Sequence, residues 1–329
     1  MSPIRRKIAA SLGRAAALTL SLAAASLAAQ DFPTKPVRIV VPFAPGGNVD
    51  ITARIIAPPL AEILGQQVIV ENRPGGGGMV ATAQVIKGPA DGYALVLGSS
   101  STISVAPATA KNPLYDPTRD LATVGPIQAV PIVLTASART TIASFRDFVA
   151  QAKARPGQVS VASAGTGTSN HLALELLIKQ TGLKLIHVPY KGSGPALADL
   201  VGGQVETMMD QLTASIAHIK EGRVRALAVT TRKRSPLLPD VPALAELGLG
   251  EYEVSTFTGL FAPAATPRAV LDRLSSALAR VLSQSAVRER FAALGVEMID
   301  ADARAFDAYV KKDYENWRAV ARDAGISLE

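Results

Sequence analysis

The sequence contains no cysteine, which excludes a disulfide framework, a thiolate metal site and a cysteine nucleophile. It contains three histidines, and no two of them have the i,i+4 spacing of a helical metal site. Aromatic residues make up 5% of the 329 residues, and the one clustered basic run is Arg232-Lys233-Arg234. A chain of this composition offers little for nucleic-acid binding. We therefore expect neither a metal nor a nucleic-acid partner.

The motifs of nucleotide-dependent and hydrolytic enzymes are also missing. The glycines at 75–78 are not followed by the Gly-Lys-Ser/Thr of a P-loop, and Gly165-Thr-Gly167 lacks the third glycine of a dinucleotide fingerprint. No Gly-x-Ser-x-Gly nucleophile elbow is present. Asp50 and Asp210 could meet across a cleft for acid–base catalysis, but capping of backbone groups or contact with a ligand explains them better. We expect no cofactor, and a hydrolase using these carboxylates is the weaker alternative.

The N-terminus has the pattern of a secretory signal peptide. Its basic residues are Arg5, Arg6, Lys7 and Arg14. An apolar run follows at 15–27, and Ser26-Leu27-Ala28 supplies the small-x-small pattern of a cleavage site. We predict that residues 1–28 are removed on export and that the mature protein is periplasmic, by either the general or the twin-arginine route. The mature chain then has 30 basic and 27 acidic residues, a net charge of about +3.

What the sequence has in abundance is glycine and hydroxyl residues placed after short apolar runs. The first example is a predicted strand at 37–41, a Pro/Gly loop at 42–48 and a helix with Ile51, Ile55 and Ile56 on one face. A helix N-terminus at the carboxyl end of a strand presents free backbone N–H groups, which bind anions. Glycines at 46 and 47 let a ligand approach the backbone closely.

The same strand–loop–helix unit recurs along the chain. Predicted strands lie at 37–41, 68–71, 93–97, 132–135, 159–162, 184–188, 205–209, 225–231 and 257–261. Predicted helices lie at 79–86, 145–154 and 303–324, and a further one begins at Thr266-Pro267 with Thr as N-cap and a stripe of Leu271, Leu274, Leu278 and Leu282. Residues 107–126 are rich in proline and are predicted to form a loop. The pattern indicates an α/β protein with mixed sheets flanked by helices.

The order of these units predicts two lobes, the first of them discontinuous. We expect lobe 1 to comprise residues 29–129 and 256–329, and lobe 2 to comprise residues 130–255. The chain would cross between them near 126–132 and 254–262. Two crossings and a cleft form a hinge, so the lobes can close around a ligand.

The loop at 163–170 is the second candidate anion site. Hydroxyl side chains occupy four of seven positions: Ser163, Thr166, Thr168 and Ser169. Helix capping needs fewer of them, so binding of a carboxylate by hydroxyls and backbone N–H groups explains the cluster better. Tyr190, at the end of a later strand, could form a wall of the cleft or belong to the core.

Several motifs together resemble the Bug family, the periplasmic solute-binding proteins of tripartite tricarboxylate transporters. The matching segments are VPFAPGGNVD (41–50), VENRPGG (70–76), DGY (91–93), HVPYKG (187–192), DLVGGQ (199–204), LAVT (227–230), LPDVP (238–242) and APAATP (262–267). They follow the family's order over nearly the whole mature chain. Two departures are Phe257, where the family often has Trp, and Asn48, near which it often has a third Gly or a Ser.

The resemblance implies a Venus-flytrap fold that traps a small carboxylate-bearing molecule between its lobes without chemical conversion. It implies that the first loop holds the ligand partly through water and that the second loop grips a carboxylate. The residues expected to contact or border the ligand are Phe43, Gly46, Gly47, Asn48, Asp50, Ser99, Ser100, Ala164, Gly165, Thr166, Thr168, Ser169, Tyr190 and Asp210. The expected partners are a small organic anion and membrane permease subunits, or alternatively an extracytoplasmic sensor domain. We expect the receptor itself to be monomeric.

Overall fold

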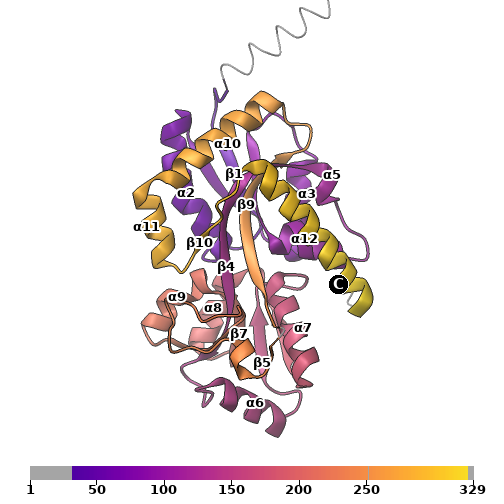
Figure 1. Cartoon of the computed structure of the whole chain (residues 1–329), viewed down its shortest axis with the longest axis vertical. Helices are drawn as coiled ribbons and strands as arrows, with labels where there is room; N and C mark the ends of the chain where they lie inside the picture. Colours follow the sequence, from indigo (N-terminus) through magenta and orange to yellow (C-terminus); the bar gives the residue numbers. More distant parts are fainter. Residues whose placement is uncertain (1–31, 251, 325–329) are drawn as a thin grey trace, which may run out of the picture.

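The computed structural model describes residues 32–250 and 252–324, and the predicted signal peptide lies outside them. The described strands are β1 (Val37–Val41), β2 (Val68–Asn72), β3 (Ala94–Ser99), β4 (Leu121–Ser137), β5 (Ser160–Ser163), β6 (Ile186–Pro189), β7 (Thr207–Gln211), β8 (Val224–Val229), β9 (Ser255–Pro263) and β10 (Glu297–Met298). The described α-helices are α2 (Asn48–Leu64), α3 (Met79–Ile86), α4 (Ala106–Thr109), α5 (Pro117–Asp120), α6 (Phe145–Ala154), α7 (Ser169–Thr181), α8 (Ser193–Gly202), α9 (Leu212–Lys220), α10 (Arg268–Ser283), α11 (Ser285–Ala293) and α12 (Ala303–Ala324). Short segments of other helix types are η1 (Gly76–Gly78), η2 (Ser101–Val105) and η3 (Leu244–Leu247). They form two lobes that follow one another along the long axis of the molecule (Figure 1).

The first sheet combines parallel and antiparallel strands. β1 lies between β2 and β3 and is parallel to both, whereas β9 lies antiparallel between β3 and β4. β10 pairs antiparallel with Gln128 and Ala129, in the middle of β4. The helices α2 and α10 pack over one face of this sheet, and α3 and α12 lie on the other side (Figure 1). We call this sheet and its helices lobe 1.

The second sheet has the same mixed character. β5 pairs in parallel with β6 and β7, and β4 pairs antiparallel with β7 and β8. The helices α6, α7, α8 and α9 surround it, and we call this body lobe 2 (Figure 1). The predicted α/β class with mixed sheets is therefore confirmed.

A single long strand, β4, runs through both lobes (Figure 1). It pairs with β9 as far as Pro131 and with β7 and β8 from Ile132 onward. Residues 107–126 contain most of α4, all of α5 and the start of β4, so the prediction that they form a loop was wrong for these parts. The pairing with β9 shifts register on either side of Gly125-Pro126. A bulge accommodates a proline within a strand because the ladder is already interrupted there.

The cores of the two lobes are separate. In lobe 1 the predicted leucine stripe of α10 faces α2: Leu274 and Leu278 are buried, and Leu271 and Leu282 are partly buried against the same cluster. On the opposite face of the sheet, Phe306 of α12 packs against strand residues. Each lobe thus has an apolar centre of its own, and Ile51 and Leu294 of lobe 1 also pack against clusters of lobe 2.

The start of α10 differs from the prediction. The helix begins at Arg268, and its N-cap position is Pro267, not Thr266. The hydroxyl of Thr266 is buried and has no hydrogen-bond partner. The helix therefore starts one residue later than expected, and its first hydrogen bond runs from the Val270 amide to the Pro267 carbonyl.

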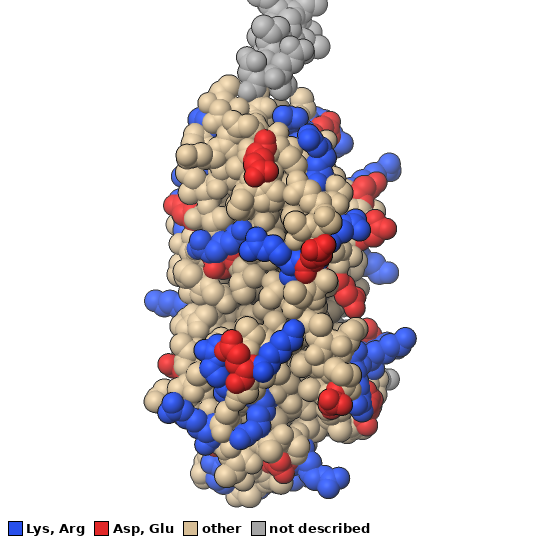
Figure 2. All heavy atoms as spheres, turned by 90° about the vertical axis from the view of Figure 1, so that its left-hand side faces the viewer, with Lys and Arg blue, Asp and Glu red and all other residues tan. Residues whose placement is uncertain are grey.

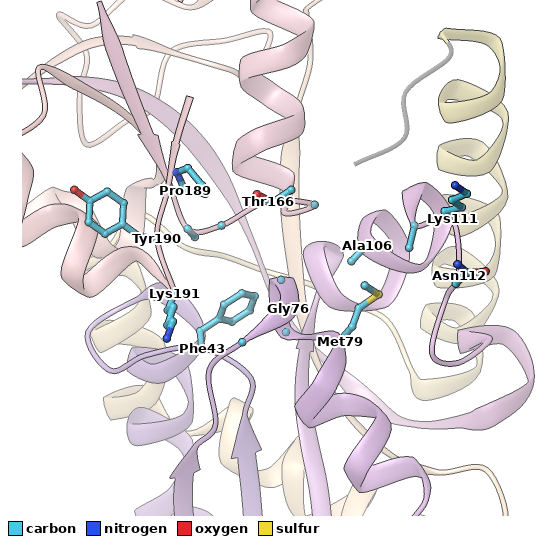
Figure 3. A pocket seen from close by; sticks show the side chains of 17 residues that line it. Phe43, Gly76, Met79, Ala106, Lys111, Asn112, Thr166, Pro189, Tyr190 and Lys191 are labelled. Atoms are coloured by element: carbon cyan, nitrogen blue, oxygen red, sulfur yellow. The ribbon is translucent and has the colours of Figure 1, made fainter. Parts of the chain in front are cut away.

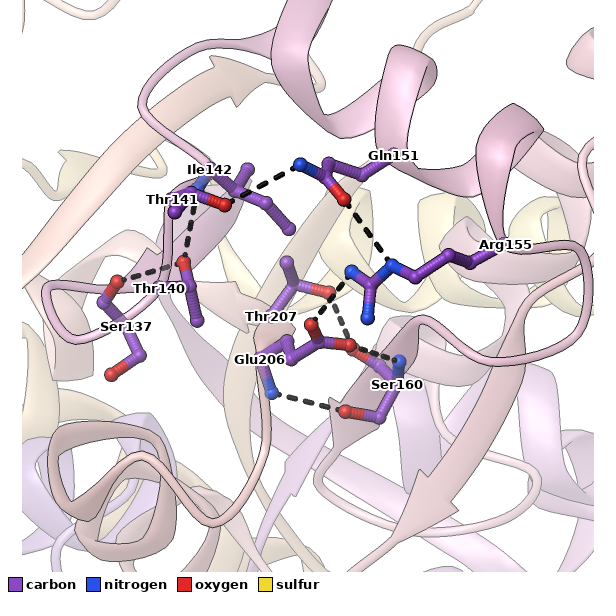
Figure 4. Close-up of polar contacts among 9 residues, drawn as sticks. All are labelled: Ser137, Thr140, Thr141, Ile142, Gln151, Arg155, Ser160, Glu206 and Thr207. Carbon is purple, nitrogen blue, oxygen red and sulfur yellow. Dashed lines mark hydrogen bonds and ion pairs between the residues drawn. The ribbon is translucent and has the colours of Figure 1, made fainter.

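Polar contacts tie the far end of lobe 2 together (Figure 4). Arg155, at the end of α6, forms an ion pair of 2.9 Å with Glu206. The Glu206 amide donates to the Ser160 hydroxyl at 3.0 Å, and the Thr207 hydroxyl donates to the Ser160 carbonyl at 2.6 Å. This network links the end of α6 to the starts of β5 and β7, at the end of lobe 2 opposite to the loops of the candidate site.

Candidate functional site

The lobes touch through the first predicted loop and the N-terminus of α8. The Ala44 amide of lobe 1 donates to the Lys191 carbonyl of lobe 2 at 3.0 Å. Next to this bond, a Cβ added to Gly194 would lie 2.0 Å from the carbonyl oxygen of Pro45. Only glycine at 194 permits this approach of the two backbones. Gly46, one of the predicted site residues, lies in the same contact. A Cβ added to it would lie 3.4 Å from the Cα of Gly194.

A second contact joins η2 of lobe 1 to the start of α7 in lobe 2. The hydroxyls of Ser101 and Ser169 lie 2.6 Å apart, and the Ser169 amide donates to the Ser101 hydroxyl at 3.0 Å. This amide is one of the free donors of the first helical turn. The predicted residue Ser169 therefore presents a donor to the opposite lobe, where it meets a serine that the sequence analysis did not select.

A small inner cavity of about 10 Å³ lies between these contacts. Its lining residues are Phe43, Gly47, Asn48, Val49, Ser99, Ser101, Ala164, Ser193 and Gln211. This volume is about that of one water-sized sphere. Five of the predicted residues meet here: Phe43, Gly47, Asn48, Ser99 and Ala164.

A larger outer cavity of about 550 Å³ opens beside it (Figure 3). Its lining residues are Phe43, the glycines at 75–78, Met79, Ala106, Ala110, Lys111, Asn112, Ala164, Gly165, Thr166, Gly167, Pro189, Tyr190 and Lys191. Phe43 and Ala164 border both cavities. The charged residues among these are the two lysines, and none of the carboxylates at 32–250 and 252–324 lines either cavity. On the face shown in Figure 2, by contrast, charges of both signs lie close together.

Asp50 shapes the first loop from within lobe 1. Its carboxylate accepts hydrogen bonds from the Gly46 amide at 2.9 Å, from Asn72 at 2.9 Å and from Arg54 at 3.0 Å. Burial favours the neutral acid, but the hydrogen bonds from Arg54, Gly46 and Asn72 outweigh it and hold the pKa of Asp50 below its ordinary value. Asp50 was predicted to border the ligand but lines neither cavity; its contacts are with the first loop and with Asn72 and Arg54.

Asp210 is fully buried in lobe 2. It accepts hydrogen bonds from the hydroxyls of Ser193 at 2.5 Å and Ser215 at 2.7 Å. Burial raises the pKa of Asp210 to about 6, although these hydroxyls oppose the shift. Asp210 thereby fixes Ser193, which lines the inner cavity. Because Asp50 and Asp210 bond to separate partners within their own lobes, the arrangement does not form an acid–base pair.

The structure gives three other predicted residues structural contacts. The Thr168 hydroxyl caps α7: it donates to the Gly165 carbonyl at 2.7 Å and accepts the His171 amide. This is a correction, because the sequence analysis assigned that hydroxyl to the ligand. The Ser100 hydroxyl accepts the Phe257 amide at 2.8 Å, and the Asn48 side chain accepts a 2.8 Å bond from Gln128.

Tyr190 stands at the edge of the outer cavity. Its hydroxyl donates to Asp199 at 2.7 Å and points away from Phe43 (Figure 3). Burial and this hydrogen bond raise the pKa of Tyr190 to about 12. The Tyr190 side chain packs against the core of lobe 2, so its hydroxyl is held within that lobe.

Four residues that line the cavities were not among those predicted from the sequence: Ser101, Lys191, Ser193 and Gln211. A signal for them existed, since each adjoins a predicted residue or motif at the carboxyl end of a strand, where ligands bind in open α/β sheets. Gln211 donates to Asn170 at 2.7 Å, a contact between the end of β7 and the start of α7 that no local pattern reveals.

Within the described residues, no group of three His, Asp or Glu side chains is placed to hold a metal ion. None of the helices at 32–250 and 252–324 has the length and apolar character needed to cross a membrane.

Comparison with known sequences now adds to this geometry. Residues 52–326 match the sequence profile of the tripartite tricarboxylate transporter family receptor. The chain belongs to this family. Among curated relatives, Protein BugT of Bordetella pertussis is 37% identical to this receptor over 307 residues, which cover 93% of this chain and 94% of BugT.

Solved structures agree with the family and the fold. The structure of periplasmic binding protein BugD has a TM-score of 0.87 and 36% identity, and the match covers 91% of this receptor and 100% of that chain. The structure of R. palustris Rpa4515 with adipate has a TM-score of 0.86 and 34% identity, with 90% and 99% covered. The predicted family and periplasmic-binding-protein fold are confirmed, and the receptor is a binding protein rather than an enzyme.

Proposed function

We propose that this receptor captures a small organic acid between its lobes and presents it to the membrane subunits of a tripartite tricarboxylate-type transporter. The acid lies in the outer cavity, with a carboxylate against the loop at 164–167 and the rest of the molecule towards Phe43 and Lys191. A cavity of about 550 Å³ falls within the range of small-ligand sites. The adipate in the Rpa4515 structure supports a carboxylate as the ligand class.

The observation that carries this proposal is the sign of the charges around the cavities. Lys191 lines the outer cavity, serines and amides line the inner one, and no carboxylate of the described residues lines either. The start of α7 adds the positive end of a helix, whose Ser169 amide already donates to Ser101 of the opposite lobe. A site built of donors and cations, with apolar walls such as Phe43 and Met79, favours an anion with a short carbon skeleton.

The inner cavity supports a role for water. Its volume of about 10 Å³ is at the lower limit for one water molecule, and its lining offers Ser99, Ser101, Ser193 and Gln211 as hydrogen-bond partners. A water held there would connect the first loop of lobe 1 to an acid in the outer cavity, at little cost compared with a direct hydrogen bond.

The remaining parts of the proposal concern export and partners. The receptor is made with a signal peptide at 1–28, is released into the periplasm and acts as a monomer. We also propose the lobe limits predicted above, with lobe 2 at 130–255. Two features support them: β4 changes its partners after Pro131, and β9 starts at Ser255. Mass spectrometry of the exported protein should give an N-terminus at Ala29, and light scattering should give the mass of one chain. A pull-down should recover permease subunits rather than a sensor domain.

A thermal-shift screen of the mature protein tests the ligand class directly, because a ligand that binds the folded state raises its apparent stability. The panel contains monocarboxylates, dicarboxylates of four to eight carbons such as adipate, tricarboxylates, amino acids, aromatic acids and uncharged sugars. We expect shifts with carboxylates alone. Shifts that occur only with uncharged sugars, or with no compound, would contradict the proposal. Mass spectrometry of the incubated acid should show it unchanged.

A further inference from the structure

Two stacked imidazoles lie directly beneath the loop proposed to hold the carboxylate. His171 of α7 and His187 of β6 have ring centroids 3.8 Å apart and ring planes inclined by 9°. His171 is buried and His187 is partly buried. Neither ring lines a cavity, so neither is a ligand contact. Each nevertheless forms a hydrogen bond to the loop, one near its end and one at its beginning.

His171 holds the end of the loop. The Gly167 amide lies 3.3 Å from Nδ1 of His171. An amide N–H can only donate, so Nδ1 must be the unprotonated acceptor and Nε2 must carry the proton. That Nε2 lies 3.3 Å from the carboxylate of Glu175, one turn further along α7. The hydrogen bond from His171 lowers the pKa of Glu175, so the carboxylate stays charged and fixes this tautomer.

His187 holds the beginning of the loop. Its Nε2 lies 2.7 Å from the Ser163 hydroxyl, which also accepts the Gly165 amide at 3.1 Å. Gly165 and Gly167 both have positive φ, of 136° and 75°, a conformation that depends on local support. His171 thus holds Gly167 directly, and His187 holds Gly165 through Ser163. These two glycines flank Thr166, so they determine how the loop faces the outer cavity.

The stacked arrangement favours uncharged rings. Protonation of His171 at Nδ1 would remove the acceptor of the Gly167 amide, and protonation of both rings would place two cations face to face. Burial lowers the pKa of His187 to about 4, the charge of His171 acts in the same direction, and Glu175 acts against it. The groups that face the pair are Glu175 of α7, the Ser163 hydroxyl of β5 and the Gly167 amide. Glu175 is the one charged group among them.

We propose that the stacked pair His171–His187 is a positioning device for the loop at 163–167, and that protonation of either ring loosens the loop and weakens the binding of the acid. This inference rests on the proposed function, because it assumes that the loop holds the carboxylate. It goes beyond that function by making release of the acid dependent on pH through residues that do not touch the acid.

The test compares His171→Gln and His171→Leu. A glutamine carbonyl can still accept the Gly167 amide but cannot titrate, whereas leucine offers no acceptor. The control is His218→Gln, which removes a partly buried histidine of α9 in the same lobe. The dissociation constant of adipate is measured by calorimetry from pH 8 to pH 4.5, and the stability of each variant is measured by thermal unfolding.

We expect His171→Leu to weaken adipate binding at least tenfold at pH 8. At pH 8 the dissociation constant of adipate for His171→Gln should lie within threefold of that for wild type. As the pH falls to 4.5, the wild-type dissociation constant should rise at least fivefold more than that of His171→Gln. Comparison at equal pH cancels protonation of adipate itself. His218→Gln should follow the wild type throughout. Equal affinity of wild type and His171→Leu, or parallel pH profiles of wild type and His171→Gln, would overturn the proposal.

A second readout separates this inference from the proposed function. Amide exchange of Gly165 and Gly167, measured by NMR without added acid, should be faster in His171→Leu than in wild type and unchanged in His171→Gln. If adipate binds no form of the protein, the proposed function has failed for this acid, and the exchange rates decide on the positioning role. Unchanged exchange in His171→Leu would then refute it.

Discussion

Replacement of Gly194 by alanine should block closure of the lobes without harming either lobe. The backbone of Gly194 is not in the left-handed region, so alanine can adopt it, and Gly194 is the second residue of α8. The added Cβ would lie 2.0 Å from the carbonyl oxygen of Pro45, whereas real contacts of this kind stay above 3.0 Å. The loop and the helix must therefore separate by at least about 1 Å. A 3.0 Å hydrogen bond such as that from Ala44 to Lys191 would be lost.

The expected loss of affinity depends on whether the clash occurs in the closed or the open form of the receptor. Overpacking of this kind costs about 1–3 kcal/mol, and the cost applies to the closed form alone. Since about 1.4 kcal/mol corresponds to a tenfold change in an equilibrium constant, affinity for the bound acid should fall about 5- to 150-fold. In a helix, alanine is more favourable than glycine by about 0.5–1 kcal/mol, so the thermal stability of the acid-free protein should not fall.

The assay combines calorimetry with adipate, or the best acid of the screen, and small-angle scattering. Gly202→Ala is the matched control, because it lies at the other end of α8 and its Cβ would approach only the Gln204 side chain, at 3.9 Å. Gly194→Ala should give weaker binding and a larger radius of gyration in the presence of the acid, and Gly202→Ala neither. Wild-type affinity and an unchanged radius for Gly194→Ala would refute the importance of this contact.

Three further predictions concern single side chains. Thr168→Ala removes the N-cap of α7 and should lower stability by about 1 kcal/mol, a shift of about 2–4 °C in Tm; an unchanged Tm would argue against the cap. Because the pKa of Asp210 is raised to about 6, the folded protein loses stability as the pH rises from about 4 to 6. The Tm of wild type relative to that of Asp210→Asn should therefore be higher at pH 4 than at pH 7. A difference in Tm that stays constant with pH would contradict this. Lys191→Gln should weaken binding of the acid about 3- to 10-fold and reduce its dependence on salt, whereas unchanged calorimetric titrations at 20 and 300 mM salt would exclude a role for this charge.

The sequence predicted the parts of the fold that are set by local pattern. The apolar run at 37–41 and the glycines after it led to β1 and the first loop, and the spacing of Leu274 and Leu278 led to the buried face of α10. The start of β4 was missed because Gly125 and Pro126 disfavour a regular strand, and the bulges that accommodate them depend on β9, more than 130 residues away.

The candidate site was predicted at the level of loops rather than of hydroxyl groups. A sequence pattern cannot distinguish a threonine that caps its own helix, as Thr168 does, from one that faces a ligand. Nor can it show that Ser101 of one lobe meets Ser169 of the other, because that contact exists only once both lobes are folded and in register. The role of Asp210, which holds Ser193 from behind, follows from burial rather than from spacing.

A crystal structure of the mature receptor with the acid that gives the largest thermal shift tests the proposed trapping of an anion most directly. We predict density for the acid in the outer cavity, with a carboxylate within hydrogen-bond distance of the backbone at 164–167 and contacts to Phe43 or its neighbours in lobe 1. An acid bound elsewhere, such as in the hollow behind the hinge near Pro131 and Lys233, with the two loops unchanged, would contradict it.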